Sequence, residues 1–236
     1  MKERPILFSG PMVRALLAGR KTQTRRLLNP QPVKLAGPNF DGLWSDTIDP
    51  VVRYFGCPHG RKRDRLWVRE TFAHCEIRER CYYAATEDRP RVFSAGFCGH
   101  GVNPPGMDWT PSIFMPRKLS RILLEIVSVR VERLQNITEE DAKAEGARPT
   151  RYHCKLSNGG TMDIGAERDR AEPQLLGMKL DVSSFGSPKR EAIVTAVEPC
   201  YREAYAELWD QINGEGAWDL NPWVWVVEFS VKEGHP

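Results

Sequence analysis

The apolar residues near the start of this chain follow the spacing of a helix. The apolar positions of residues 12–17 share one helical face, which predicts a short helix there. Ser9 is placed to cap this helix, and Gly19 is placed to end it. Residues 20–28 are polar, basic and rich in threonine, so we expect a turn that leads into an extended stretch.

Two further helices are predicted in the second half of the chain. Thr138 is followed by three acidic residues, a pattern typical of a capped helix start, and Gly146 is placed to close this short helix. Glu145 therefore falls in its last turn, where a carboxylate faces the negative end of the helix dipole. Residues 201–212 carry apolar side chains at helical spacing, and Gly214 is placed to stop that helix.

Several stretches alternate apolar and polar residues, as strands do. We expect strands at residues 64–72, 82–84, 121–134 and 223–229. The longest of them changes its apolar phase near Ile126, which predicts a β-bulge or a strand buried on both sides. Either feature suits a small barrel.

The remaining segments are rich in residues that interrupt regular structure. Proline and glycine punctuate residues 29–63, which we interpret mainly as loop. Residues 147–198 are sparse in apolar side chains, and we interpret them as a loop-rich insertion without a second core. The prediction is a single domain over residues 1–236, of mixed α and β structure, interrupted by this insertion.

The composition is that of an ordinary globular protein with a core of its own. Hydrophobic residues make up 41% and charged residues 28%, and the formal net charge is only +3. The charge is unevenly distributed, because residues 1–34 contain eight basic residues and a single acid, Glu3. Such a cluster is either a footprint for phosphates or a solvated face, and charge alone does not separate the two.

No signal for export, for membrane insertion or for a metal is found in the chain. The first residues lack the apolar segment of a secretory signal, and no apolar run is long enough to span a bilayer, so we expect a cytoplasmic protein. Three Cys–His pairs resemble zinc ligands, but their spacing is too irregular for the paired ligands of a zinc site, and we predict no metal and no cofactor. These pairs are Cys57 with His59, Cys98 with His100, and Cys154 with His153.

Three segments together resemble the ASCH family. LLAGRKTQTRR (16–26) is similar to the family's A-G-x-K-T-x-T-x-R segment after the first helix. DRLWVRE (64–70) resembles its strand after a turn, and ITEEDAKAEG (137–146) resembles its short acidic helix that ends in glutamate. The resemblance implies a PUA-like fold: a small, mostly antiparallel β-barrel flanked by short helices. Longer tryptophan-rich members of this type often come from phages or prophages.

The resemblance also implies a site and an activity. Some small bacterial members are amidohydrolases that remove the acetyl group from N4-acetylcytidine with a lysine, a threonine and a glutamate, which match Lys21, Thr24 and Glu145. Other members are linked to RNA cleavage or RNA binding. In a strict strand, residues 21 and 24 project to opposite faces, so convergence requires Lys21 to lie in the turn after the helix. Six further residues are candidates to contact the substrate: Arg20, Arg26, Trp67, Arg69, Glu70 and Arg117.

Alternatives stay open at this point. Lys21 and Glu145 would also suit a structural ion pair, with Thr24 as a simple strand former. Trp67 and Trp225 are able to stack a base, although Trp225 lies in an apolar strand and is expected in the core. The predicted partner is RNA or a modified nucleoside, without a membrane. The chain would otherwise be a non-enzymatic RNA-binding module or a phage accessory protein that binds a host protein through residues 147–198.

Overall fold

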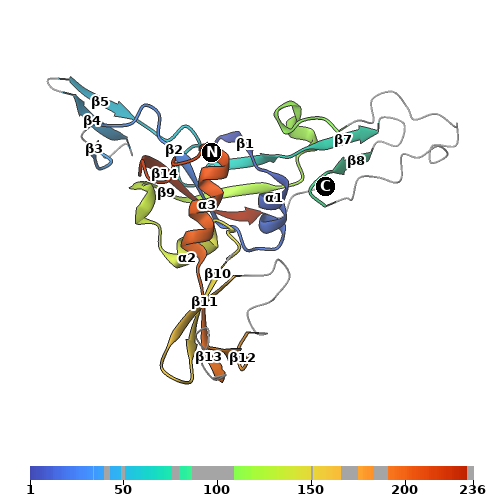
Figure 1. Cartoon of the computed structure of the whole chain (residues 1–236). Coiled ribbons are helices and arrows are strands. Elements are labelled where there is room, and N and C mark those ends of the chain that lie inside the picture. The colour runs from blue at the N-terminus through green and yellow to red at the C-terminus, as the bar shows by residue number, and fades with distance from the viewer. Residues whose placement is uncertain are drawn as a thin grey trace, which may run out of the picture. The chain divides into compact units, whose positions relative to one another are not determined.

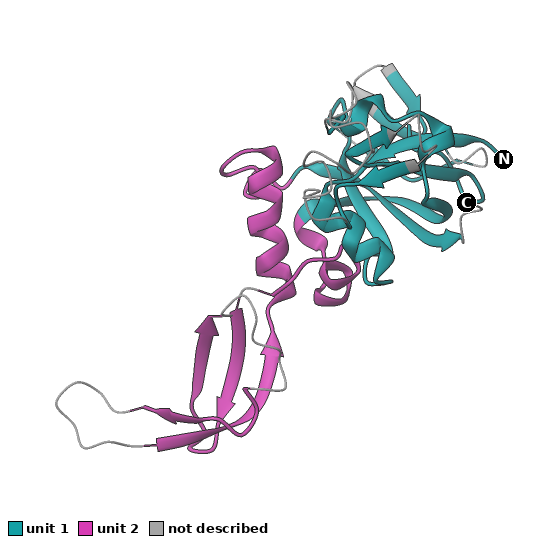
Figure 2. Cartoon of the chain, turned by 90° about the vertical axis from the view of Figure 1, so that its right-hand side faces the viewer, with its two compact units in different colours: residues 1–134, 222–236 teal, residues 135–221 magenta. Residues whose placement is uncertain are grey.

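The structure, a computed structural model, describes residues 1–33, 35–39, 43–48, 51–75, 80–86, 109–149, 151–165, 175–182 and 191–232. It has mixed α and β structure, as predicted, and is rich in sheet. The chain divides into two compact units, Met1–Leu134 with Pro222–Pro236 and Gln135–Asn221 (Figure 2). The second unit is thus larger than the predicted insertion at residues 147–198.

A curled five-stranded sheet forms the frame of the first unit (Figure 1). Its strands follow the order β1 (Glu3–Leu7), β6 (Arg65–Arg69), β9 (Leu123–Arg133), β14 (Trp223–Lys232) and β2 (Gln23–Leu27). Strands β1 and β6 pair in parallel, and the other neighbours are antiparallel. The first and last strands of this order, β1 and β2, are the edges of the sheet.

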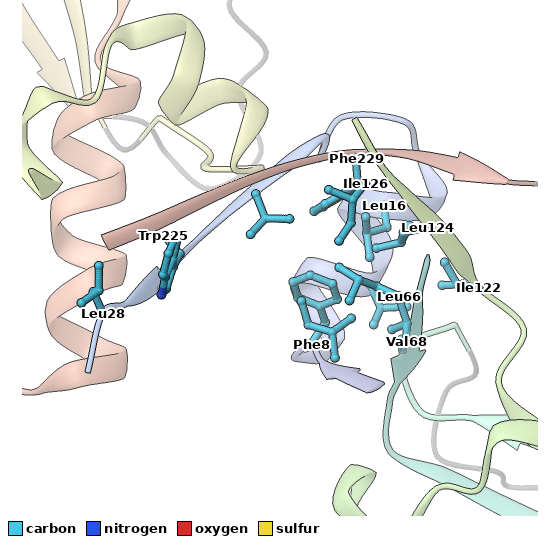
Figure 3. Close-up of a cluster of buried hydrophobic side chains, with 14 of the residues drawn as sticks. Phe8, Leu16, Leu28, Leu66, Val68, Ile122, Leu124, Ile126, Trp225 and Phe229 are labelled. Atoms are coloured by element: carbon cyan, nitrogen blue, oxygen red, sulfur yellow. The ribbon is translucent and has the colours of Figure 1, made fainter. Parts of the chain in front are cut away.

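Helix α1 (Gly10–Leu17) packs its apolar face into the core of this unit, as predicted. Ser9 occupies the N-cap position with an extended backbone, and Gly19 adopts a φ of 68° just beyond the helix. Leu16 lies in one buried cluster with Leu66 of β6 and with Phe8, which follows β1 directly (Figure 3). The predicted core position of Trp225 is confirmed, because this side chain is buried in the same cluster.

The change of phase predicted near Ile126 is a β-bulge. Glu228 pairs with Ser128, but the next residue of β14, Phe229, pairs with Ile126. Val127 is therefore the extra residue of β9, and its side chain is 47% exposed while Ile126 is buried. The bulge lets a single strand bury Ile126 and Val131 on one face although they are an odd number of residues apart.

The interpretation of residues 29–63 mainly as loop is wrong in part. Three short strands, β3 (Leu35–Ala36), β4 (Trp44–Ile48) and β5 (Val51–Phe55), form an antiparallel sheet. Trp44 and Phe55 are opposite each other in it, and both rings meet the Trp225 ring edge-on, at centroid distances of 6.4 and 5.9 Å. These contacts join residues about 180 positions apart. The local pattern of prolines and glycines therefore could not predict the strands that the contacts stabilise.

Shorter elements complete the first unit. Strands β7 (Phe72–Cys75) and β8 (Arg80–Tyr83) form a two-stranded ribbon. The strand predicted at 82–84 is thus present, but it begins two residues earlier and ends one residue earlier than predicted. Two short 3-10 helices, η3 (Ser112–Phe114) and η4 (Arg117–Leu119), follow in the described part of this unit, and a further one, η5 (Leu134–Asn136), begins at its last residue before the chain enters the second unit.

The second unit contains the two predicted helices. Helix α2 (Glu139–Ala144) begins at Thr138, whose hydroxyl accepts a hydrogen bond from the Asp141 amide at 3.1 Å. Helix α3 (Tyr201–Asn213) ends at Gly214, which has a φ of 107°. Both helix predictions are confirmed.

The second unit also contains a four-stranded sheet, which contradicts the prediction that residues 147–198 hold no second core. Its order is β11 (Thr161–Gly165), β10 (Arg151–Leu156), β13 (Glu191–Pro199) and β12 (Lys179–Asp181). Apolar side chains of its strands form a buried cluster together with Leu175, which precedes β12: Tyr152, Cys154, Leu156, Leu175, Ala192 and Val194. Because cysteine and alanine contribute to this core, a count of large apolar residues underestimates it.

Within the part of the chain that the structure describes, no helix combines the length and the apolar character needed to cross a membrane.

Candidate functional site

Lys21 lies in the turn between α1 and β2, as its convergence with Thr24 requires. The backbone N–H groups of Arg20 and Lys21 both donate to the Ala15 carbonyl, at 2.9 and 3.1 Å. Gly19 supplies the left-handed conformation that this turn needs. Because β2 begins only at Gln23, Lys21 is not bound by the alternation of the strand.

The side chain of Lys21 is completely buried, with a relative exposure of 0%. Lysine is almost never buried to this degree unless its charge is compensated. Part of the compensation comes from Phe8, because the Lys21 ammonium nitrogen lies 5.5 Å from the centre of the Phe8 ring. A buried amine beside an aromatic ring is an unusual and costly feature, and such features are concentrated at functional sites.

Thr24 is buried on the inner face of the sheet, at 3% exposure. It is directly opposite Val227 of β14, and residues opposite each other in a sheet share a face. Val227 belongs to the core cluster, so the Thr24 side chain projects to the core side of β2. Lys21, in the turn before β2, and Thr24, the second residue of β2, are thus both buried polar residues.

Glu145 is the C-cap residue of α2 in the second unit. Its backbone N–H donates to the Asp141 carbonyl at 2.8 Å, and its side chain is 4% exposed. All three residues of the predicted catalytic set are therefore buried polar groups. That the Glu145 carboxylate meets Lys21 and Thr24 in one pocket stays a prediction.

The two arginines of the 20–26 segment that were candidates for substrate contact differ in their environment. Arg20 is exposed. Arg26 is half-buried, and its guanidinium donates to the Leu7 carbonyl at 2.6 Å and lies 5.5 Å from the centre of the Phe8 ring. Arg26 is thus engaged with the edge strand β1, and its role toward a ligand stays a prediction.

Trp67 and Arg69 lie on the outer face of β6 and contact each other. The guanidinium carbon of Arg69 is 4.7 Å from the centre of the Trp67 ring, which is itself largely buried. The Arg69 Nε is buried and makes no hydrogen bond within the described residues. A base could stack on Trp67 only if the arginine moved or took part in the stack.

Glu70 and Arg117 are each held by a partner of opposite charge. Arg121 donates from Nε and Nη2 to the two carboxylate oxygens of Glu70, both at 2.9 Å. Arg117 donates from Nε to Glu3 at 2.9 Å, and this hydrogen bond, with the nearby charge of Arg65, lowers the pKa of Glu3. Sequence reasoning missed Arg121, since nothing local links it to a carboxylate 51 residues earlier.

The Cys–His pairs provide no metal site within the described residues, where no group of three His, Cys, Asp or Glu side chains could hold an ion. Cys98 and His100 lie outside those residues. Burial raises the pKa of the Cys57 thiol to about 11, so this thiol stays protonated at neutral pH. Burial, together with the positive charges of Arg26 and Arg4, lowers the pKa of His59 to about 4.

A cleft of about 600 Å³ in the first unit was also missed by sequence reasoning. It lies at the amino ends of β1 and β6, and its basic residues include Lys2, Arg4, Arg61 and Lys62. The available signal was the run Arg61-Lys62-Arg63, which falls in the stretch interpreted mainly as loop.

Comparison with family models, curated proteins and solved structures finds no match to this chain.

Proposed function

We propose that the first unit is a PUA-like domain of the ASCH type, and that the protein binds a modified nucleoside or RNA at Lys21 and Thr24 and hydrolyses an acyl amide on N4 of cytidine. The observation that carries the proposal is the complete burial of Lys21 in the turn after α1, three residues before the buried Thr24. The K-T-x-T segment supplies an amine and a hydroxyl there, the two groups that an acyl transfer needs.

The proposed reaction has two steps. Lys21 removes the hydroxyl proton of Thr24. Burial disfavours the charged ammonium, so the amine is neutral and its lone pair is free to accept that proton. The Thr24 oxygen attacks the acyl carbonyl, and the bond from the acyl carbon to N4 breaks. The proton that Lys21 took from Thr24 passes through the Glu145 carboxylate to that nitrogen, so Lys21 and Glu145 return to their starting states. Water then hydrolyses the acyl-threonine ester, which releases the carboxylic acid and restores Thr24. This scheme requires the Glu145 carboxyl to reach the leaving nitrogen.

The contacts of the neighbouring arginines favour a nucleoside without phosphates at this position. The side chain of Arg25 is fully buried and lies 3.4 Å from Glu132, and Arg26 is bound to the Leu7 carbonyl. The Arg25 guanidinium is not presented to solvent, and the half-buried Arg26 guanidinium is already engaged by a backbone carbonyl. Arg20 is left as the exposed cation of this segment.

The test is incubation of the protein with N4-acetylcytidine, other acylated nucleosides and short RNAs that contain them, with detection of the products by mass. We expect release of cytidine or of the deacylated RNA. Thr24→Ser keeps the hydroxyl and serves as the matched control for Thr24→Val, which has nearly the same shape without it. Turnover by Thr24→Val equal to that of the unmodified protein would contradict the proposed reaction, and binding without any turnover would leave a nucleoside- or RNA-binding module.

A further inference from the structure

The cleft at the amino ends of β1 and β6 combines a basic side with an apolar side. Basic residues come from two segments, Lys2 and Arg4 at the start of the chain and Arg61 with Lys62 in the turn before β6. The apolar residues come from β9 and β14 of the five-stranded sheet, from β4, and from positions between β3 and β4. They are Pro38, Leu43, Trp44, Val127, Val129 and Trp225. Its volume is in the range of pockets that hold small ligands.

A single buried carboxylate, Asp64, holds the basic segments in place. One of its oxygens accepts from the backbone N–H of Lys2 at 2.8 Å. The other accepts from Arg4 Nη1 at 2.9 Å and from the backbone N–H of Arg61 at 3.3 Å. These hydrogen bonds lower the pKa of Asp64 to about 2, so the carboxylate is ionised at neutral pH. Both oxygens of Asp64 are thus engaged in holding the two basic segments of the cleft.

Asp64 neutralises one of the four cations, and the other three charges remain. The side chains of Lys2, Arg61 and Lys62 are exposed, and within the described residues none of them has an ion pair. A cleft with three uncompensated positive charges attracts anions, because low-dielectric walls concentrate the field. The backbone of the Arg61–Asp64 turn is fixed by a hydrogen bond from the Asp64 amide to the Arg61 carbonyl at 2.9 Å.

The apolar side of the cleft is suited to a flat ring. Trp44 stands edge-on to Trp225, with an interplanar angle of 83°, so the two indoles form a corner. Val127 also lines the cleft, because the β-bulge directs its side chain away from the core. Bases of single-stranded nucleic acids stack on exposed aromatic side chains, with phosphates held by neighbouring lysines and arginines.

We propose that this cleft binds single-stranded nucleic acid, with a base against Trp44 and adjacent phosphates on Lys2, Arg61 and Lys62. The cleft shares no residue with the Lys21–Thr24 site. The inference extends the proposed function by giving a longer RNA substrate a second point of attachment. Its test measures binding, so an absence of hydrolysis would not affect the result.

The experiment measures the affinity of the full chain for a short labelled oligouridylate by fluorescence anisotropy, at several salt concentrations between about 50 and 200 mM. The variant Arg61→Glu/Lys62→Glu reverses two exposed cleft charges. The matched control, Lys118→Glu/Arg148→Glu, reverses two exposed cations outside the cleft and changes the net charge by the same amount. We expect the cleft variant to bind at least about tenfold more weakly, with a salt slope smaller by about 1.4, and the control to bind nearly normally.

Three results would overturn the inference. Equal losses in the cleft variant and in the control would show that only the overall charge matters. Equal affinity for a duplex of the same length would exclude the stacked base, because a duplex does not offer its ring faces. If uridine 5′-phosphate alone bound as tightly as the oligouridylate, the cleft would be a mononucleotide site. Selective loss in the cleft variant, together with a preference for the single-stranded oligomer, supports the proposal.

Discussion

The guanidinium of Arg26 donates a hydrogen bond of 2.6 Å to the carbonyl of Leu7, and these residues lie on the two edge strands of the five-stranded sheet. A curled sheet with unpaired edges exposes backbone groups that need partners. Here a side chain from β2 satisfies a carbonyl of β1, so Arg26 connects the first strand of the sheet to the last. The same guanidinium lies over the Phe8 ring, next to the residue whose carbonyl it binds.

We therefore expect Arg26→Ala to lower the free energy of unfolding by about 2 kcal/mol, since a hydrogen bond from a charged donor is lost together with the packing of the side-chain stem. Urea unfolding followed by tryptophan fluorescence measures the change. Arg20→Ala is the control, because this exposed arginine should change the stability by less than about 0.5 kcal/mol. Equal stability of the two variants would mean that the link between the edges is not energetically important.

The pair formed by Glu70 and Arg121 leads to a second prediction. Glu70 is buried and both of its oxygens are bound by Arg121, whose guanidinium carbon also lies 3.9 Å from the centre of the Tyr83 ring. Glu70→Gln should cost about 3 kcal/mol, because it leaves the guanidinium without its counter-charge in a largely buried setting. Arg121→Lys keeps a positive charge and should cost less. A stability of Glu70→Gln within about 0.5 kcal/mol of the unmodified protein would contradict this account.

A double-mutant cycle tests whether Lys21 and Glu145 interact. We expect Lys21→Met and Glu145→Gln to show a coupling energy between about 0.5 and 3 kcal/mol in urea unfolding, the range found for residues in contact. The pair Lys21→Met and Glu140→Gln is the control, since Glu140 is exposed on the same helix. A coupling energy near zero for Lys21 and Glu145 would place the two groups in separate environments and remove Glu145 from the proposed reaction.

The local elements of this fold could be predicted from the sequence, because each depends on neighbouring residues. The cap at Thr138, the ends at Gly19 and Gly214, and the bulge after Ile126 all follow from short patterns. The turn that frees Lys21 from the alternation of β2 also follows, since a glycine stands two residues before it.

The contacts between distant segments could not be predicted in this way. The strands β3 to β5 depend on Trp225, which lies about 170 residues beyond Phe55. The pairing of Glu70 with Arg121 and the organisation of the basic cleft by Asp64 likewise join segments that no local spacing connects. For the same reason, Glu132 as the partner of Arg25 and the Leu7 carbonyl as the partner of Arg26 could not be predicted from the sequence.

The last prediction concerns His59, whose pKa is lowered to about 4 by burial and by the charges of Arg26 and Arg4. In the unfolded chain this imidazole has a pKa near 6.5. Between about pH 6.5 and pH 4 the unfolded state binds a proton that the folded state does not, so the free energy of unfolding falls as the pH is lowered. The stability that depends on a neutral His59 is fully present above about pH 6.5. Below that, the free energy of unfolding falls by at most about 1.4 kcal/mol per pH unit on account of this residue. Asp64, with a pKa of about 2, contributes its own loss only below about pH 4.

Urea unfolding at a series of pH values measures this dependence, and His59→Gln should remove most of the slope between about pH 6.5 and pH 4. His153→Gln is the matched control, because His153 is an exposed residue of the second unit and forms its ion pair with Asp163 at the surface. The pH range separates the effect of His59 from that of Asp64, since Asp64 lowers the stability only at lower pH. An unchanged slope in His59→Gln would mean that the imidazole is protonated as easily in the folded protein as in the unfolded chain, and that the charges of Arg4 and Arg26 do not act on it.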